Sequence, residues 1–425
     1  MKKLLERRTV AVLIVVVAAA VSATAGLAST TNKGSSKANL QLTVGNLVEL
    51  TGVAAFLGPP FVQAGNTATT MINRAAALGK VPFRVKSVVG DTQGDPQAAL
   101  LAARSAVDKG ATCLMGAAST PESLSIANAL TVQKQIVLFP EASSTAISTI
   151  DDKDTVFRTV PDTPKEAIAA ANAASRLLGG ARGKTFAIAA FNQPYGTDLA
   201  KYFAQVWTAR GGEIQGPIFF DTKATSLDSE AAAIVKNNPD GYWIIGDPAV
   251  FSRLIQALLR TGKYDPAKLL VPSLLAFPAV PNDIPKQAME GAHAETPTVL
   301  TTTKSYQAFD RVWKTSGKAE HNPSDVSIVD AYAVCALAAA EAHSTKPASI
   351  LKNIRKVAGP PGKTYNILSL SEALKAAWAG KDINYEGLSS DLDFNAAGDP
   401  GSTLFRIVSY KDGQQVPGPL TTAKR

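Results

Sequence analysis

The sequence contains few of the residues on which catalysis and metal binding most often depend. Among its 425 residues there are two cysteines and three histidines, and only 7% of the residues are aromatic. The histidines, His293, His321 and His343, have no metal-like spacing with one another or with a cysteine. We therefore predict no metal site, and we expect few candidates for a general base.

Short motifs of the common enzyme classes are also absent. The sequence has no GxGxxG segment after a strand, no GxxxxGK[ST] phosphate loop, no GxSxG elbow and no HExxH. We expect no catalytic residue, no cofactor and no enzymatic activity. Because the members of a catalytic triad need not be close in sequence, an enzyme on an α/β scaffold stays open as a third interpretation.

Long apolar runs and clustered charge are lacking as well. After the N-terminus no stretch is apolar for long enough to span a bilayer. The formal net charge is +8, but lysine and arginine are interleaved with aspartate and glutamate. This distribution is typical of a solvated surface and argues against nucleic-acid binding.

The N-terminus carries the clearest local signal. Four basic residues among the first eight precede an apolar run over residues 10–21, and Ala23 and Ala25 fit a small-residue cleavage site, with Ala28 as a second candidate. This order predicts a signal peptide over residues 1–28 and a periplasmic mature protein. An uncleaved membrane anchor is the alternative, although the run is short for a span.

The two cysteines, Cys113 and Cys335, are far apart in sequence and flanked by apolar residues. This setting favours two buried free thiols. An exported protein can also pair its cysteines, and sequence alone does not show whether the geometry permits a bond here. The pairing therefore stays open.

Strand-like and helix-like runs alternate along the mature chain in two arrays. The first array has its segments at residues 40–47, 61–77, 81–89, 96–109, 112–115, 121–133 and 136–139. The second has them at residues 165–178, 185–191, 195–210, 214–220, 229–237, 241–245, 248–261 and 269–272. Repeated β-α-β units predict an α/β fold with two doubly wound parallel sheets.

The last third of the chain has a different pattern. Four helices are predicted at residues 306–315, 325–343, 349–356 and 371–378, and residues 392–394 and 403–410 are β-like.

Ligands of open α/β sheets bind in the loops that follow the strands, and in the first array these loops contain polar or aromatic residues. Phe56 and Leu57 follow the first strand and are candidates for a pocket wall. Ser119 and Thr120 precede a helix, where they also fit a helix cap and a capping box with a glutamate three residues after Ser119. Capping alone is the alternative role for these two residues.

Two further groups of candidates follow other strands. The loop after residue 139 supplies Ala142, Ser143 and Ser144, whose hydroxyl and main-chain N–H groups suit a carboxylate, unless the segment is an ordinary polar turn. In the second array, Tyr195 is placed to cover a ligand, and Asp247 is placed to pair with a cationic group or to cap the helix that follows.

These segments together resemble the type I periplasmic binding proteins of the branched-chain amino-acid (Leu/Ile/Val) family, which serve ABC importers. The resemblance covers nearly all of residues 40–410 and depends on the order and spacing of short segments, namely those at residues 50–52, 58–61, 90–96, 116–120, 157–161, 194–196, 211–212 and 330–332.

The resemblance implies two Rossmann-like lobes joined by a three-strand hinge, with crossings near Thr159, near Glu295 and at residues 393–401. We expect residues 38–158 and 296–392 in lobe 1, and residues 159–295 and 393–415 in lobe 2. The lobes of such proteins close over the ligand by hinge motion.

The resemblance also implies roles for single residues. In the family, lobe 1 holds a ligand carboxylate through groups that match Ser119, Ala142 and Ser143 or Ser144, and a tyrosine of lobe 2 matches Tyr195. Members that bind amino acids commonly carry an acidic residue where this chain has Leu274. A buried ammonium without a partner is costly.

Three outcomes of that departure are open: Asp247 or Glu141 holds the amine, or the ligand has no amine. We predict a monomeric solute-binding component of an ABC importer, with a small carboxylate or amino-acid-like ligand and a membrane permease as its partners. A ligand-sensing protein that acts on a membrane receptor is the alternative.

Overall fold

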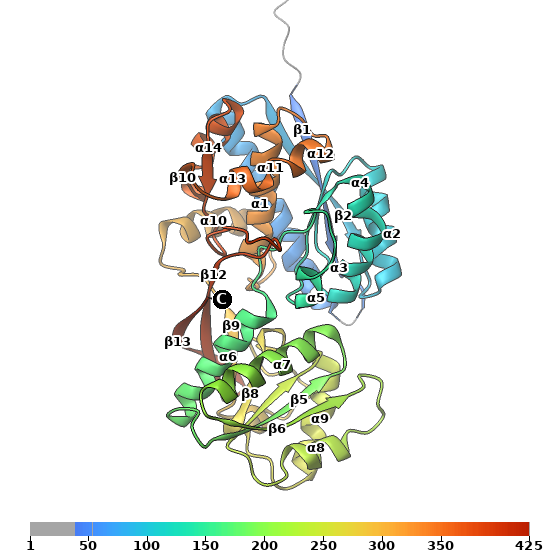
Figure 1. The fold of residues 1–425 in the computed structure, drawn as a ribbon, viewed down its shortest axis with the longest axis vertical. Helices are drawn as coiled ribbons and strands as arrows, with labels where there is room; N and C mark the ends of the chain where they lie inside the picture. The colour runs from blue at the N-terminus through green and yellow to red at the C-terminus, as the bar shows by residue number, and fades with distance from the viewer. Residues whose placement is uncertain (1–38, 53, 425) are drawn as a thin grey trace, which may run out of the picture. The chain divides into compact units, whose positions relative to one another are not determined.

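Two β-sheets organise the chain (Figure 1). The structure is a computed structural model and describes residues 39–52 and 54–424. The signal peptide predicted over residues 1–28 lies outside these residues. Within the described part of the chain, none of the helices is both long enough and apolar enough to cross a membrane.

The first sheet has four parallel strands in the order β2-β1-β3-β4. Its strands and helices alternate as β1 (Leu40–Val48), α1 (Gly58–Gly79), β2 (Phe83–Asp91), α2 (Pro96–Asp108), β3 (Cys113–Met115), α3 (Thr120–Ile126), α4 (Val132–Lys134), β4 (Val137–Phe139) and α5 (Thr145–Ser148). The last seven residues of β1 are all buried. Continuous burial is expected of a parallel strand that is covered on both faces.

The second sheet has seven strands in the order β13-β12-β9-β8-β7-β5-β6. Its elements are α6 (Thr163–Leu178), β5 (Thr185–Phe191), α7 (Pro194–Ala209), β6 (Glu213–Phe220), α8 (Asp228–Ile234), β7 (Gly241–Ile245), α9 (Pro248–Arg260), β8 (Leu269–Val271) and β9 (His293–Pro297), with β12 (Ser402–Lys411) and β13 (Gln414–Lys424) from the end of the chain. β12 runs antiparallel to β9 and β13, and the other pairs are parallel.

The helices of the last third return to the first sheet, as the orange ribbons beside the blue ones in Figure 1 show. They are α10 (Lys304–Ser316), α11 (Asp325–Glu341), α12 (Pro347–Leu351), α13 (Ile354–Ala358) and α14 (Leu370–Trp378), with the short parallel pair β10 (Lys363–Tyr365) and β11 (Ile383–Tyr385). One apolar core joins residues of β1 and α1 with residues of α11 and α14. A separate core fills the second sheet and its helices.

The two cysteines are bonded, which corrects the free thiols that the sequence favoured. Cys113 in β3 and Cys335 in α11 form a disulfide with a Cα–Cα distance of 6.6 Å. The bond links strands near the start of the chain to a helix 222 residues later. Their apolar flanks reflect burial in one core, and burial is as compatible with a disulfide as with a thiol.

Local signals explain where several helices begin. Asp95 caps α2 by accepting hydrogen bonds from the main-chain N–H groups of Gln97 and Ala98, and Pro96 occupies the first helical position. Asp162 and Asp247 cap α6 and α9 in the same way, each followed by a proline within two residues. Such caps satisfy N–H groups that a helix cannot bond internally.

The predicted alternation of elements is confirmed, with some local errors. Residues 392–394 form no strand, because Leu392 has a φ of 58° and Phe394 packs against the ring of Phe157 instead. The single helix predicted over residues 349–356 is two short helices, α12 and α13. β9, β10, β11 and β13 were not anticipated. The residue boundaries assigned to the two lobes stay a prediction.

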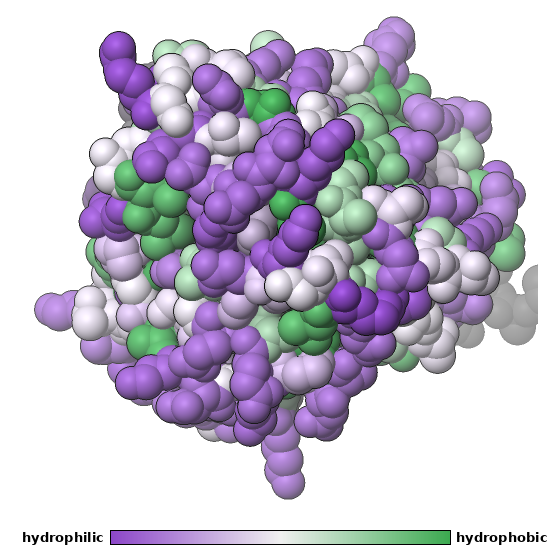
Figure 2. All heavy atoms as spheres, turned by 90° about the horizontal axis from the view of Figure 1, so that it is seen from below, coloured by the Kyte–Doolittle hydropathy of each residue, from purple (hydrophilic) through white to green (hydrophobic). Residues whose placement is uncertain are grey.

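The face of the molecule shown in Figure 2 is mainly polar, with apolar side chains in small separate groups. This mixture is what the interleaved charges of the sequence indicate.

Candidate functional site

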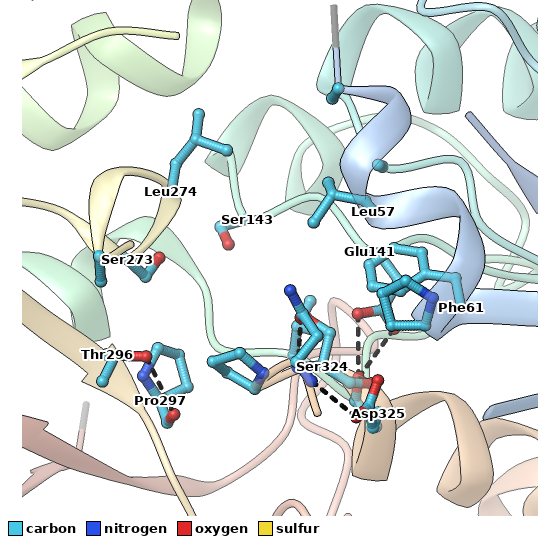
Figure 3. Close-up of a pocket in the computed structure, with 18 of the residues that line it drawn as sticks. Leu57, Phe61, Glu141, Ser143, Ser273, Leu274, Thr296, Pro297, Ser324 and Asp325 are labelled. Atoms are coloured by element: carbon cyan, nitrogen blue, oxygen red, sulfur yellow. Dashed lines mark hydrogen bonds between the residues drawn. The ribbon is translucent and has the colours of Figure 1, made fainter. Parts of the chain in front are cut away.

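A cavity of about 1050 Å³ lies between the two sheets (Figure 3). On one side it is lined by the loops that follow β1, β3 and β4, and on the other by the segments that follow β5, β7 and β8. Figure 3 shows Leu274 and Ser273 across the opening from Leu57 and Glu141. The carboxyl ends of both sets of strands therefore face one shared space, where α/β sheets bind ligands.

Nine of the ten candidate residues line this cavity: Phe56, Leu57, Ser119, Thr120, Ala142, Ser143, Tyr195, Asp247 and Leu274. The tenth, Ser144, is fully buried, and its hydroxyl donates to Asp198 of α7 at 2.6 Å. The structure thus brings together most of the residues that the sequence singled out. Contact between them and a ligand stays a prediction.

Of the two candidates at the start of α3, Ser119 caps the helix. The Ser119 hydroxyl lies 2.6 Å from the Glu122 carboxylate, which also accepts the main-chain N–H of Ser119 at 3.1 Å. The capping box expected from the sequence is therefore present. Thr120 is buried at the first turn of the helix. Ser119 lines the cavity while it holds the helix start in place.

Ser143 and Tyr195 converge on a carboxylate that the sequence analysis missed. Glu166 of α6 is buried and accepts hydrogen bonds from Ser143 at 3.2 Å, Ser273 at 3.2 Å and Tyr195 at 2.8 Å. Burial raises the pKa of Glu166 to about 7. Three hydroxyl groups from three segments thus meet at one acidic side chain that lines the cavity.

Of the two acidic candidates for an amine partner, Asp247 has a structural role. One of its carboxylate oxygens accepts the main-chain N–H of Val250 at 2.9 Å and caps α9. This is the alternative role that the sequence left open.

The other candidate, Glu141, is held against α11. Its two carboxyl oxygens lie 3.0 and 2.9 Å from the Ser327 hydroxyl, which is also 2.7 Å from the main-chain carbonyl of Ser324. Burial raises the pKa of Glu141 to about 8. A hydroxyl has one proton to donate, so a protonated Glu141 satisfies both contacts of Ser327 at once.

A second missed group lies at the start of α11. Asp325 accepts the main-chain N–H of Asn322 at 2.7 Å and contacts the His321 ring at 3.1 Å. Burial raises the pKa of Asp325 to about 6. The His321 ring stacks on Trp313 with 4.6 Å between centroids, and both Asp325 and His321 line the cavity.

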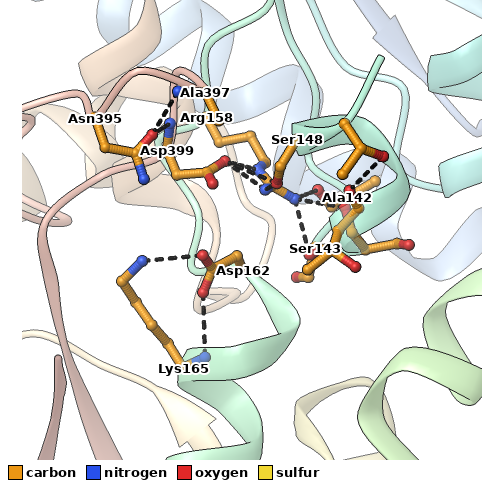
Figure 4. Close-up of polar contacts among 12 residues, drawn as sticks. Ala142, Ser143, Ser148, Arg158, Asp162, Lys165, Asn395, Ala397 and Asp399 are labelled. Carbon is orange, nitrogen blue, oxygen red and sulfur yellow. Dashed lines mark hydrogen bonds and ion pairs between the residues drawn. The ribbon is translucent and has the colours of Figure 1, made fainter. Parts of the chain in front are cut away.

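Behind the cavity, Arg158 fixes the loop that carries Ala142 and Ser143 (Figure 4). Its guanidinium donates to the main-chain carbonyls of Ala142, Ser143 and Ser144, and it pairs with the buried carboxylate of Asp399. Because the carbonyls of this loop are bonded to Arg158, they point away from the cavity. Arg158 therefore orients the loop.

The missed residues have no local signature. Glu166 lies within an alanine-rich helical run and Asp325 at the start of another, where an acidic residue is ordinary. Glu166 is distinguished only by distant partners such as Ser273, which is 107 residues away, and Asp325 by its burial. For Arg158 the sequence did hold a signal, because residues 157–161 are among the segments that carry the resemblance.

Comparison with known proteins finds relatives that are binding proteins. A family model described as "Periplasmic binding protein" matches residues 41–365. The substrate-binding protein BasB of a chemotactic signal transduction system in Halobacterium salinarum is 24% identical over 369 residues, which cover 84% of each chain.

Two solved structures illustrate the shared fold. The leucine-binding protein LivK of Thermotoga maritima superimposes with a TM-score of 0.67 at 19% identity, covering 89% of this chain and 98% of that one. A solute-binding protein of an ABC transporter from Rhodopseudomonas palustris, in complex with p-hydroxybenzoic acid, gives 0.69 at 16% identity, covering 90% and 97%.

The structural likenesses establish the fold, and the family model spans most of the sequence, including the loops that line the cavity. Two lobes with parallel sheets and a shared cavity are the architecture of the type I fold. The chain belongs to the periplasmic binding protein family.

Proposed function

We propose that this protein is the solute-binding component of an ABC importer and captures a small carboxylate or amino-acid-like molecule between its lobes. The observation that carries the proposal is the cavity of about 1050 Å³ lined from both sheets. A volume of this order suits a small molecule, and a lining drawn from two lobes lets hinge closure enclose it.

The lining combines the two kinds of surface that such a ligand requires. Apolar side chains, among them Leu57, Leu274 and Phe277, offer contact area for an aliphatic or aromatic body. Ser143 and Tyr195, whose hydroxyl groups donate to Glu166, contribute polar surface to the lining. In this proposal the polar groups fix the orientation of the ligand and the apolar groups supply most of the affinity.

The names of the structural neighbours support this chemistry. One is a branched-chain amino-acid transporter binding protein, LivJ of Streptococcus pneumoniae, in complex with isoleucine. Others from Rhodopseudomonas palustris hold benzoate or 4-hydroxybenzoate. All of these ligands pair a carboxylate with an apolar body.

The partner in this proposal is a membrane permease, and the location is outside the cytoplasm, as for the family. A second candidate function is ligand sensing through a membrane receptor, which the chemotactic relative favours. Capture of the purified protein by its own permease in a ligand-dependent manner supports import. Capture by a transducer receptor instead supports sensing.

A thermal-shift screen tests the ligand part of the proposal. The mature protein, from about residue 29, is mixed with amino acids, aliphatic and aromatic carboxylates, and short amides. A ligand at one hundred times its dissociation constant adds about 2.7 kcal/mol of stability, which gives a clear shift. A shift with members of one chemical class supports the proposal, and no shift with any of them contradicts it.

A further inference from the structure

The cavity lining is acidic, which matters for any ligand that is charged. Six carboxyl groups line it, against one arginine and one histidine: Glu49, Glu141, Glu166, Asp247, Glu320 and Asp325, with Arg406 and His321. Where these groups are ionised, a plain carboxylate meets repulsion in such a lining. A ligand that also carries a cationic nitrogen meets attraction.

Most of these carboxyl groups already serve the chain itself. Asp247 caps α9, Glu49 accepts the main-chain N–H of Ala54 at 2.7 Å, and Asp325 accepts that of Asn322. Glu141 is held by Ser327 on α11. Glu320 is exposed at the rim. These groups do not need a ligand to satisfy them.

Glu166 differs because its partners are hydroxyl groups of both lobes. Ser143 comes from the loop after β4, Tyr195 from the start of α7, and Ser273 from the segment after β8. Ser273 directly precedes Leu274, so Glu166 is bonded to the segment after β8 that lines the cavity.

A second carboxyl group, Glu295 of β9, is close enough to Glu166 to be affected by its charge. Its side chain is fully buried, and neither of its oxygens has a hydrogen-bond partner of ordinary geometry. The charged groups that act on this pair are Asp162 and the two glutamates themselves, with Tyr195 adjacent. The nearest lysine in sequence, Lys165, is paired with Asp162 at 3.2 Å.

Two buried carboxyl groups without a cation cannot both ionise at low cost. They therefore keep a proton while the cavity is empty or receive a positive charge from elsewhere. Burial raises the pKa of Glu166 to about 7, and burial together with the charge of Glu166 raises the pKa of Glu295 well above its usual value. The direction of both shifts agrees with a retained proton.

We propose that Glu166 binds a protonated amine of the ligand. This inference rests on the proposed function and narrows its ligand to amine-bearing molecules, such as amino acids. On binding, the ligand ammonium donates a hydrogen bond to Glu166. The proton held by the Glu166 and Glu295 pair leaves to solvent. The ligand ammonium then takes the place of that proton beside the carboxyl groups.

The test compares matched ligands on matched variants. Leucine is paired with 4-methylpentanoate and phenylalanine with 3-phenylpropanoate, so each pair differs in the amine. Glu166→Gln keeps the shape of the side chain and loses its charge, and Glu213→Gln, on the exposed surface of β6, is the control. Affinities are measured by isothermal titration calorimetry.

We expect the wild type to bind one amine-bearing member at least tenfold tighter than its amine-free match. Glu166→Gln removes that preference, and Glu213→Gln keeps it. Equal affinity within both pairs, or a preference that survives in Glu166→Gln, overturns the inference but leaves the proposed function in place. Failure of every ligand to bind contradicts the proposed function and the inference with it.

A second measurement does not depend on how the variant folds. Near pH 7, titrations of the wild type with the amine-bearing ligand in buffers of different ionisation enthalpy give different apparent enthalpies, because a proton is released on binding. Apparent enthalpies that are the same in every buffer overturn the proton displacement by the ammonium.

Discussion

At the scale of single residues, the polar groups behind the cavity depend most on Arg158. Its guanidinium is almost fully buried and bonds to Asp399 and to three carbonyls of one loop. A buried charge that loses its partner is left without compensation. The loop with Ala142 and Ser143 therefore depends on a side chain that is not in the cavity lining.

Replacing Asp399 with asparagine tests this dependence. We expect the free energy of unfolding to fall by about 3–5 kcal/mol, since the variant leaves the Arg158 guanidinium without its buried counter-charge. Denaturant titration measures the change. The control is Arg260→Ala, which breaks an exposed pair with Asp228 and has a much smaller effect. Equal losses in the two variants contradict the account.

The raised pKa of Glu166 predicts how stability changes with pH. In the folded chain Glu166 keeps its proton up to about pH 7, whereas in the unfolded chain it loses it near pH 4.5. The contribution of this proton is complete below pH 4.5 and is lost as pH rises through 7. The protein without ligand is therefore less stable at pH 8 than at pH 5.

Glu141, with a pKa of about 8, and Asp325 and Asp330, with pKa values of about 6, act in the same direction. Denaturation midpoints of the wild type and Glu166→Gln at pH 5 and pH 8 isolate the share of Glu166. We expect a smaller loss in the variant. A loss of the same size in both proteins shows that Glu166 is ionised throughout this range.

At the scale of elements, the disulfide ties β3 to α11 across most of the sequence. The double variant Cys113→Ala, Cys335→Ala removes the bond, and we expect it to lower the free energy of unfolding by about 2–4 kcal/mol while the fold persists. Thermal denaturation measures the loss. Two titratable thiols in the unreduced, denatured wild type contradict the bond itself.

The start of α3 combines a cap with a place in the cavity lining. Ser119→Ala removes the cap, which costs about 1 kcal/mol, and it also weakens ligand binding. Asp265→Ala removes the cap of the short 3-10 helix at Pro266–Lys268, none of whose residues is in the lining, and leaves affinity unchanged. Calorimetry with any identified ligand separates the two. Wild-type affinity in Ser119→Ala removes Ser119 from the site.

The elements that the sequence predicted have strong periodic patterns, and the missed ones do not. β13 contains Pro417 and Gly418 and few apolar residues, so only its pairing with β12 makes it a strand. β9, with the sequence HAETP, becomes a strand because β8 and β12 lie on either side of it. Pairing of this kind is decided by the tertiary fold and leaves no local pattern.

The same distinction holds for the site. Loops after strands were predictable, because parallel strands all present their carboxyl ends at one edge. Glu166 and Glu295 were not, because each belongs to a regular element and meets its partners only after the lobes have folded. The family resemblance identified Ser143 and Tyr195, and the structure revealed the Glu166 carboxylate to which both donate.

At the scale of the whole molecule, separate apolar cores support two sheets whose loops line a shared cavity. Because the lobes have separate cores, one lobe can move relative to the other without unpacking either core. Such an arrangement suits capture of a solute by closure. The central claim is that one small molecule binds in this cavity.

The most direct test is calorimetry of the best ligand against two leucine-to-tryptophan variants of the second lobe. Leu274→Trp fills part of the cavity, and Leu259→Trp adds the same bulk to the exposed surface of α9. The account predicts binding of one ligand per chain in the wild type and in Leu259→Trp, and a loss of at least tenfold in affinity in Leu274→Trp. Unchanged affinity in Leu274→Trp would contradict the claim that this cavity is the binding site.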